Sequence, residues 1–199
     1  MSTALVYSEA QKINPSAIIE LFTLQLSQTF HGDTSIYRFH GGSNLNNNGE
    51  IVWAGNSYTR MPIIADGFAY RRGQIPRPKL TISNALGSIS TILNAVNTAT
   101  VAGAVNTGND LTGATVTRII TMARFLDAVN FPSNVNPYGT PDPAAELPRE
   151  VYFIDRKATE NRNLVQFEMV TSFDLHGVGA PKKLVTRDDF PGVGTFVNF

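Results

Sequence analysis

The sequence predicts a mainly β protein, an antiparallel β-barrel or sandwich with one short helix and an extended C-terminal arm. Runs of β-branched and aromatic residues recur between glycine- and asparagine-rich turns, and helical periodicity occurs once. With 199 residues, 42% of them hydrophobic, the chain can bury one core. We expect a β-rich domain over residues 1–175 and the arm over 176–199. The expected strands cover residues 17–26, 36–40, 51–61, 68–83, 115–127 and 150–173.

The first elements are predicted to form a β-meander. Residues 15–26 fit either a helix capped by Asn14 or a strand with alternating apolar side chains. We favour the strand because a second β-rich run follows at 35–40, and the glycine and aspartate between the two runs suit a hairpin connection. The glycine- and asparagine-rich stretch 41–49 then predicts an exposed loop.

Two further strand regions follow this loop. Between residues 51 and 61, two short β-rich runs flank Ala54-Gly55-Asn56-Ser57, a composition typical of a hairpin turn. Residues 68–83 alternate at both ends, and the two prolines before Lys79 suit the start of a strand, where a missing N–H is tolerated. We therefore expect a hairpin and then a long strand region.

The helix and the longest connections lie in the second half of the chain. Apolar residues at helical spacing predict one short helix at 86–97, and the small, polar residues of 98–110 predict a loop without fixed structure. Residues 114–127 alternate and are rich in β-branched side chains, so we expect one long strand there. Five of the eleven prolines fall within 130–148, which predicts an irregular excursion.

The clearest hairpin signal comes near the end of the chain. Residues 151–156 and 164–170 alternate on either side of a polar loop over 157–163, so both strands should be half buried. The tail from 176 has four glycines, two prolines and mixed charges, which predicts an extended arm.

Composition excludes several classes of function. Sixteen basic and sixteen acidic residues balance, which argues against a protein that grips nucleic acid over a large surface. The absence of cysteine excludes disulfides, cysteine nucleophiles and thiolate-held zinc or iron–sulfur clusters. No phosphate-binding loop, G-x-S-x-G or H-E-x-x-H pattern occurs, so we expect no enzyme. The N-terminus lacks a signal-peptide pattern and no apolar stretch is long enough to span a bilayer, so we expect a soluble protein without membrane contact.

Metal and acid–base chemistry have little support. His31, His40 and His176 could gather in the fold, but no ligand stands at a spacing that would strengthen a metal site, and we expect surface or hydrogen-bonded histidines that alanine can replace. The consecutive carboxylates Asp188 and Asp189 should point apart and be solvated. We therefore expect neither a metal nor a catalytic residue.

One basic cluster can be interpreted in two ways. Its cations stand beside Phe68 and Tyr70, an arrangement that can bind single-stranded nucleic acid by stacking. Arginines and aromatic residues are also enriched at protein interfaces, and the neutral net charge favours that reading. We therefore expect a protein interface, with DNA contact at most transient. The cluster consists of Arg71, Arg72, Arg77 and Lys79.

Five stretches of the chain resemble a known family. In order and at similar spacing, they resemble the minor tail protein L family of lambda-like long-tailed phages, with similarity from about Ile13 to Val185. The stretches are Val52–Tyr58, Arg77–Asn84, Arg124–Phe131, Val151–Arg162 and Phe173–Val178.

The resemblance implies a structural subunit rather than an enzyme. It implies a ring of this chain, with a trimer expected, at the virion tail tip between the tail tube and the receptor-binding fibre, after assembly in the host cytoplasm. The implied partners are other copies of the chain and other tail-tip proteins, including the distal tail ring and the central fibre protein. Family members typically continue into a cysteine-containing segment that holds an iron–sulfur cluster. Here that place reads Arg187 to Phe196 without cysteine, so no cofactor is expected, and either the member is naturally shortened or a second polypeptide supplies the segment.

The ring contacts are expected in the irregular segment 130–148 and in the arm from Leu184, whose aromatic residues need a neighbour to bury them. The competing hypothesis is a β-sandwich ligand-binding module, such as a carbohydrate-binding or adhesin domain. Trp53 discriminates between them, because a sugar platform needs its ring open to solvent. The expected interface residues are Arg71, Arg72, Arg77, Arg124, Phe131, Tyr138, Leu147, Phe190, Phe196 and Phe199.

Overall fold

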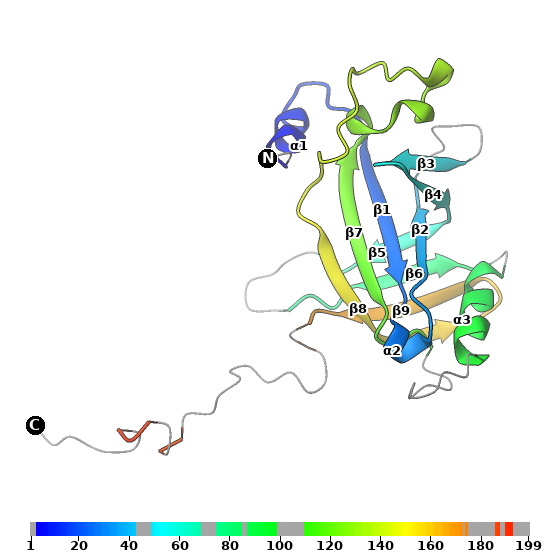
Figure 1. Ribbon diagram of the computed structural model, residues 1–199, viewed down its shortest axis with the longest axis vertical. Coiled ribbons are helices and arrows are strands. Elements are labelled where there is room, and N and C mark those ends of the chain that lie inside the picture. The colour runs from blue at the N-terminus through cyan, green and yellow to red at the C-terminus, as the bar shows by residue number, and fades with distance from the viewer. Residues whose placement is uncertain are drawn as a thin grey trace, which may run out of the picture.

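The computed structural model describes residues 3–42, 49–68, 75–84, 87–98, 110–172, 174, 186–187 and 190–192. Within this part the chain is mainly β, as predicted, with three α-helices (Figure 1). No helix there is both long and apolar enough to cross a membrane. The elements are α1 (Thr3–Ala10), β1 (Ile18–Gln25), α2 (Gln28–His31), β2 (Ile36–His40), β3 (Glu50–Trp53), β4 (Asn56–Arg60), β5 (Ile63–Asp66), β6 (Lys79–Ser83), α3 (Ser88–Thr98), β7 (Thr115–Met122), β8 (Glu150–Glu160) and β9 (Leu164–Val170), with short 3-10 turns at Ala123–Phe125, Ala128–Asn130 and Pro132–Asn134.

All nine strands belong to one sheet, in the order β3-β4-β2-β1-β7-β8-β9-β6-β5. The sheet does not close on itself, so the sandwich alternative holds and the barrel does not. We expected antiparallel pairing throughout, but β4 runs parallel to β2, because Phe39 pairs with Thr59 and His40 with Arg60. Strand β3 stands between them in the sequence and runs antiparallel to β4, so β4 has the same direction as β2.

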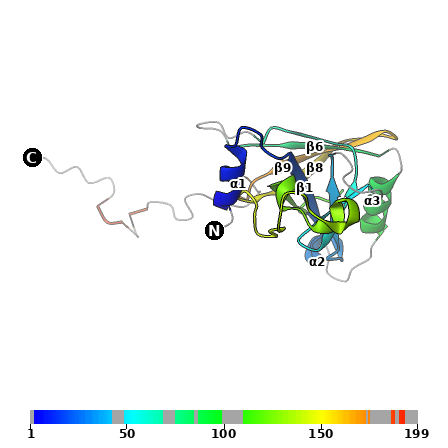
Figure 2. The ribbon, with the colours of Figure 1, turned by 90° about the horizontal axis from the view of Figure 1, so that it is seen from above.

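The long strand β8 carries the sheet from one layer into the other. Its first residues pair with β7 and its remainder pairs with β9, with two register shifts between Ile154 and Thr159. Such shifts bend a strand. Figure 1 shows the consequence: β1, β2 and β7 stand roughly upright, while β6 and β9 cross behind them. Figure 2, seen from above, places α1 and α3 at opposite ends of the body.

Three clusters of buried side chains hold these layers together. The largest lies between the layers and includes Phe22, Tyr152 and Phe167. The second surrounds Trp53, and the third lies beneath α1, where Val6 meets Phe125. Fully buried side chains alternate with more accessible ones along β6 and along most of β9, as the period of two in a strand requires, so the prediction of strands there is confirmed.

Several expected boundaries were wrong. Phe68 is buried but lies outside any strand, and β6 begins only at Lys79, because Pro76 and Pro78 cannot donate to a ladder. The strand expected at 115–127 ends at Met122. Ala123 then donates its N–H to Ala17, just before the start of β1, and a 3-10 turn begins. Strand β8 extends through Glu160 into the region expected to be a loop.

Other elements were missed altogether. Strand β5, paired with β6, was not expected, and neither was α1, which exposes Leu5 and Tyr7 while burying Val6 and Glu9. The expected hairpin connection after β1 contains α2, which ends at Gly32 in the left-handed region. The helix expected at 86–97 is confirmed as α3. The expected loop at 98–110 and the arm from 176 lie almost wholly outside the described residues.

Candidate assembly surface

Trp53 is the last residue of β3, at the tip of the β3–β4 hairpin. The turn places Ala54 and Gly55 at positive φ, which suits a tight hairpin connection. The Trp53 side chain is only 2% exposed and packs with Ile51 and Leu126. Its ring face is therefore not available as a platform for a sugar. A solvent-exposed ring would have favoured the carbohydrate-binding hypothesis, and the ring of Trp53 is buried.

The outer edge of β3 is covered by one side chain from a distant segment. The amide oxygen of Asn130 accepts the N–H of Val52 at 2.7 Å, and its amide nitrogen donates to the Val52 carbonyl at 2.6 Å. Asn130 thereby satisfies the two peptide groups that a neighbouring strand would bind. Asp127 accepts the Gly55 N–H at 2.8 Å beside it. This edge of the sheet is closed to a further strand at Val52.

The described part of the basic cluster is neutralised. Arg77 pairs with Asp174 at 2.6 Å and Lys79 pairs with Glu168 at 3.2 Å. Hydrogen bonds from Arg156 and Lys79 lower the pKa of Glu168, so this carboxylate stays charged. Arg71 and Arg72 lie outside the described residues.

Arg124 lies in a cleft of about 560 Å³ between α1 and the chain near Pro141. Its guanidinium is 3.6 Å from Glu9, and the side chain is 39% exposed. Lys12 also bonds Glu9, and this hydrogen bond lowers the pKa of the Glu9 carboxyl. Asn136 fixes the backbone below the cleft by donating to the carbonyl groups of Arg124 and Leu126. Arg124 is thus held on a rigid segment with its head group reachable from solvent.

The apolar interface residues differ in how much of them is available to a partner. Phe131 is half-buried against the Trp53 cluster and Leu147 is half-buried beneath α1, so the chain's own core covers both in part. Tyr138 is 45% exposed and stacks edge-on against Phe131, with ring centroids 6.1 Å apart. Phe190 is 46% exposed. Phe196 and Phe199 lie outside the described residues.

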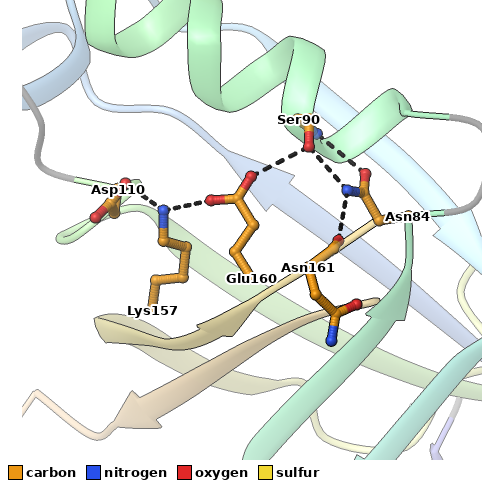
Figure 3. A network of polar contacts seen from close by, with 6 residues as sticks. All are labelled: Asn84, Ser90, Asp110, Lys157, Glu160 and Asn161. Carbon is orange, nitrogen blue, oxygen red and sulfur yellow. Dashed lines mark hydrogen bonds and ion pairs between the residues drawn. The ribbon is translucent and has the colours of Figure 1, made fainter. Parts of the chain in front are cut away.

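A polar network ties α3 to the ends of β6 and β8 (Figure 3). Asn84 donates to Ser90 at 2.8 Å and to the Asn161 carbonyl, and its own oxygen accepts the Ser90 N–H. The Ser90 hydroxyl donates to Glu160, whose other oxygen is 2.5 Å from Lys157. Lys157 also reaches Asp110 at 2.7 Å.

The stretches that carry the family resemblance therefore contact one another. Asn84 of one stretch bonds Asn161 of another, Arg77 pairs with Asp174, and Asn130 holds the hairpin that contains Val52. These contacts hold distant parts of the fold together.

The sequence reasoning missed Arg118 on β7. Its guanidinium bonds Glu20 at 2.5 Å and Glu150 at 2.9 Å and stacks over Phe68 at 4.6 Å. Burial opposes the charged form, but the two carboxylates outweigh it and raise the pKa of Arg118. All three partners are distant in sequence. An arginine within an alternating strand pattern does not indicate which distant side chains it will contact.

His31 and His40 are buried and hydrogen-bonded rather than on the surface. His31 accepts the Ser27 N–H at 2.9 Å, and His40 lies 3.2 Å from the Gly49 carbonyl. Burial makes alanine at either position a truncation that leaves a cavity, so we now expect such variants to lose stability. His176 and the pair Asp188 and Asp189 lie outside the described residues. In the part described, no three His, Asp or Glu side chains are grouped as metal ligands.

The buried histidines predict a dependence of stability on pH. Burial lowers the pKa of both His31 and His40, whereas in the unfolded chain the pKa is about 6.5. As the pH falls below that value the unfolded chain binds more protons, so the free energy of unfolding should decrease between pH 7.5 and 5.5. Urea unfolding at the two pH values measures it. His40→Gln should flatten the dependence, and equal stability at both pH values would contradict the assignment.

Comparison with known proteins adds two findings. A family model described as phage minor tail protein L matches residues 29–191. A curated protein named tail tip protein L, from Escherichia phage lambda, is 32% identical over 137 residues. The matched region covers 68% of this chain and 51% of the relative, so the chain spans about half the length of the curated relative it matches.

Proposed function

The chain belongs to the phage minor tail protein L family, and from this premise we propose that it is a structural protein of a long-tailed bacteriophage tail. The observation that carries the proposal is the family match over residues 29–191. The burial of Trp53 supports it, because it leaves the carbohydrate-binding alternative without its platform. The role proposed is assembly and not catalysis.

More specifically, we propose that copies of the chain form a ring, a trimer, in the tail-tip hub between the tail tube and the receptor-binding fibre. Its neighbours there are the distal tail ring and the central fibre protein, and the ring is built in the host cytoplasm. Exposed aromatic residues support this proposal, because Tyr138 and Phe190 present rings that a neighbour could bury. Arg124, held on a rigid turn, is the charged contact proposed.

The test is complementation of a phage that lacks this gene product with the Arg124→Ala variant. Because the Arg124–Glu9 pair is partly exposed, folding should lose less than about 1 kcal/mol. An interfacial arginine is often worth about 2 kcal/mol, so the affinity of the subunit contact should fall roughly 30-fold and fewer tails should be completed. Electron microscopy counts complete tails, and thermal unfolding checks the fold.

Arg156→Ala is the matched control, since Arg156 is also an exposed arginine with one carboxylate partner, Glu168, at 2.7 Å. It should leave tail completion unchanged. If the Arg124→Ala variant assembled tails normally, Arg124 would not be part of the subunit contact. A particle reconstruction in which the chain is absent from the tail would overturn the proposed function.

A further inference from the structure

The turn Asp110–Gly113, which leads into β7, has a strained backbone. Asp110 has a φ angle of 51° and Leu111 one of 66°, although neither residue is glycine. Residues with a side chain seldom adopt this left-handed conformation, and for a bulky residue such as leucine it has an energetic cost. Such a conformation persists only where the surrounding structure fixes it. The turn therefore depends on its contacts to keep this shape.

The core and β8 hold the end of the turn. The Leu111 side chain is fully buried in the largest core cluster. Gly113 donates its N–H to the Ile154 carbonyl at 2.8 Å, and the Ala114 carbonyl accepts the Ile154 N–H at 2.9 Å. The start of the turn, at Asp110, is held by a side chain of β8.

That side chain is Lys157, which lies between the turn and α3 (Figure 3). Its ammonium group donates to Asp110 at 2.7 Å and to Glu160 at 2.5 Å. The other carboxylate oxygen of Glu160 accepts the hydroxyl of Ser90, in α3, at 3.1 Å. Burial opposes the charged form of Lys157, but the two carboxylates outweigh it and raise the pKa of its amine. A continuous chain of polar contacts thus joins the strained turn to α3.

A β-bulge places Lys157 and Glu160 on the same face of β8. An odd number of positions separates them, so a regular strand would turn their side chains to opposite faces. The register shifts between Lys157 and Thr159, and the extra residue reverses the alternation. Lys157 is therefore paired with Phe167 and Glu160 with Val165, and both partners are buried core residues. The bulge brings the ammonium group and the carboxylate together on the side where α3 packs.

We propose that Lys157 couples α3 to the turn Asp110–Gly113, so that the two segments open and close together. They precede and follow residues 99–109, which lie outside the described residues. Ile89 and Leu93 of α3 and Leu111 of the turn also pack in one core cluster, and this packing is the competing route of coupling. All of these contacts lie within one chain, so the proposal does not depend on the proposed ring.

Hydrogen exchange at increasing urea concentrations below the unfolding transition tests the coupling. Amides that open together share one opening free energy and one dependence on urea. In the wild type, the amides of Leu93 in α3 and Gly113 in the turn should share both. The amide of Leu24 in β1, a strand that is paired on both sides, should exchange at least roughly tenfold more slowly than either.

Two substitutions separate the route through Lys157 from the route through the core. Asp110→Asn removes one partly exposed ion pair, so the exchange of Leu93 and of Gly113 should accelerate alike, by roughly threefold. Lys157→Met keeps the apolar stem and removes the charge, so the two amides should then open with different free energies. In the Lys157→Met background, Asp110→Asn should no longer change the exchange of Leu93.

Arg156→Ala is the matched control, because Arg156 is the neighbouring residue on β8 and its guanidinium lies 2.7 Å from Glu168. In this variant Leu93 and Gly113 should still open together. Thermal unfolding of each variant confirms that it is folded. If Lys157→Met does not fold, Asp110→Asn still decides the proposal, because unequal acceleration of the two amides would contradict it.

Two further results would overturn the proposal. Different opening free energies for Leu93 and Gly113 in the wild type would show that the two segments open independently. A shared opening that persists in Lys157→Met would assign the coupling to the core cluster and not to Lys157.

Discussion

Trp53→Ala is expected to lower the free energy of unfolding by about 3–5 kcal/mol, the usual loss when a buried aromatic side chain is truncated. The indole is almost fully buried and fills the space between the β3–β4 hairpin and the turn that carries Leu126. Because small domains are stable by only about 5–15 kcal/mol, the variant should unfold at far lower urea concentration. Circular dichroism measures this, since the substitution removes the one tryptophan of the chain.

Two controls separate lost packing from a lost binding surface. Trp53→Phe keeps a ring in the cavity and should lose clearly less stability than Trp53→Ala. Tyr7→Ala removes an aromatic ring that is 53% exposed and should stay within about 0.5 kcal/mol of the wild type. If Trp53→Ala were as stable as the wild type and oligosaccharides changed the Trp53 fluorescence of the native protein, the carbohydrate-binding hypothesis would be restored.

Local sequence patterns were sufficient to predict an element where one of its faces is buried and the other is more exposed. The β8–β9 hairpin could be predicted because its side chains alternate between the core and solvent, and α3 could be predicted because Ile89, Leu93 and Val96 return to one buried face. The end of β7 could not, because alternation continues in the sequence past Met122. Met122 pairs with Ile18, the first residue of β1, so β7 has no further partner residue on that strand and the chain turns.

Contacts between residues far apart in the sequence could not be predicted from the sequence pattern. Arg118 is separated from Glu20 by 98 positions, and Asn130 from Val52 by 78, so only the folded chain shows that each pair meets. The parallel pairing of β2 with β4 was missed for a similar reason, because the meander is the simplest reading of consecutive strands. Family resemblance identified the stretches around Val52 and Asn130 but not the contact between them.

Asn130→Ala should destabilise the chain by about 2–4 kcal/mol, although it removes no apolar group. Asn130 is 1% exposed, and its side chain makes three hydrogen bonds, two to Val52 and one to the Asp127 carbonyl. Alanine would leave the Val52 peptide groups without these partners, and an unsatisfied buried polar group costs about 1–3 kcal/mol. Urea unfolding measures the loss, and hydrogen exchange at Val52 should accelerate more than exchange at the strands around Tyr152.

The neighbouring substitution Asp127→Ala is the matched control. Asp127 bonds the exposed Gly55 N–H, which water can satisfy instead, so its loss should cost less than about 1 kcal/mol. Asn130→Asp tests the donor role, because an ionised carboxylate can accept from Val52 but cannot donate to its carbonyl. Burial would raise the pKa of the new carboxyl above its unfolded value, so this variant should regain stability as the pH falls and the group takes up a proton. Equal losses for Asn130→Ala and Asp127→Ala would show that the β3 edge is held by packing around Trp53 and not by the Asn130 amide.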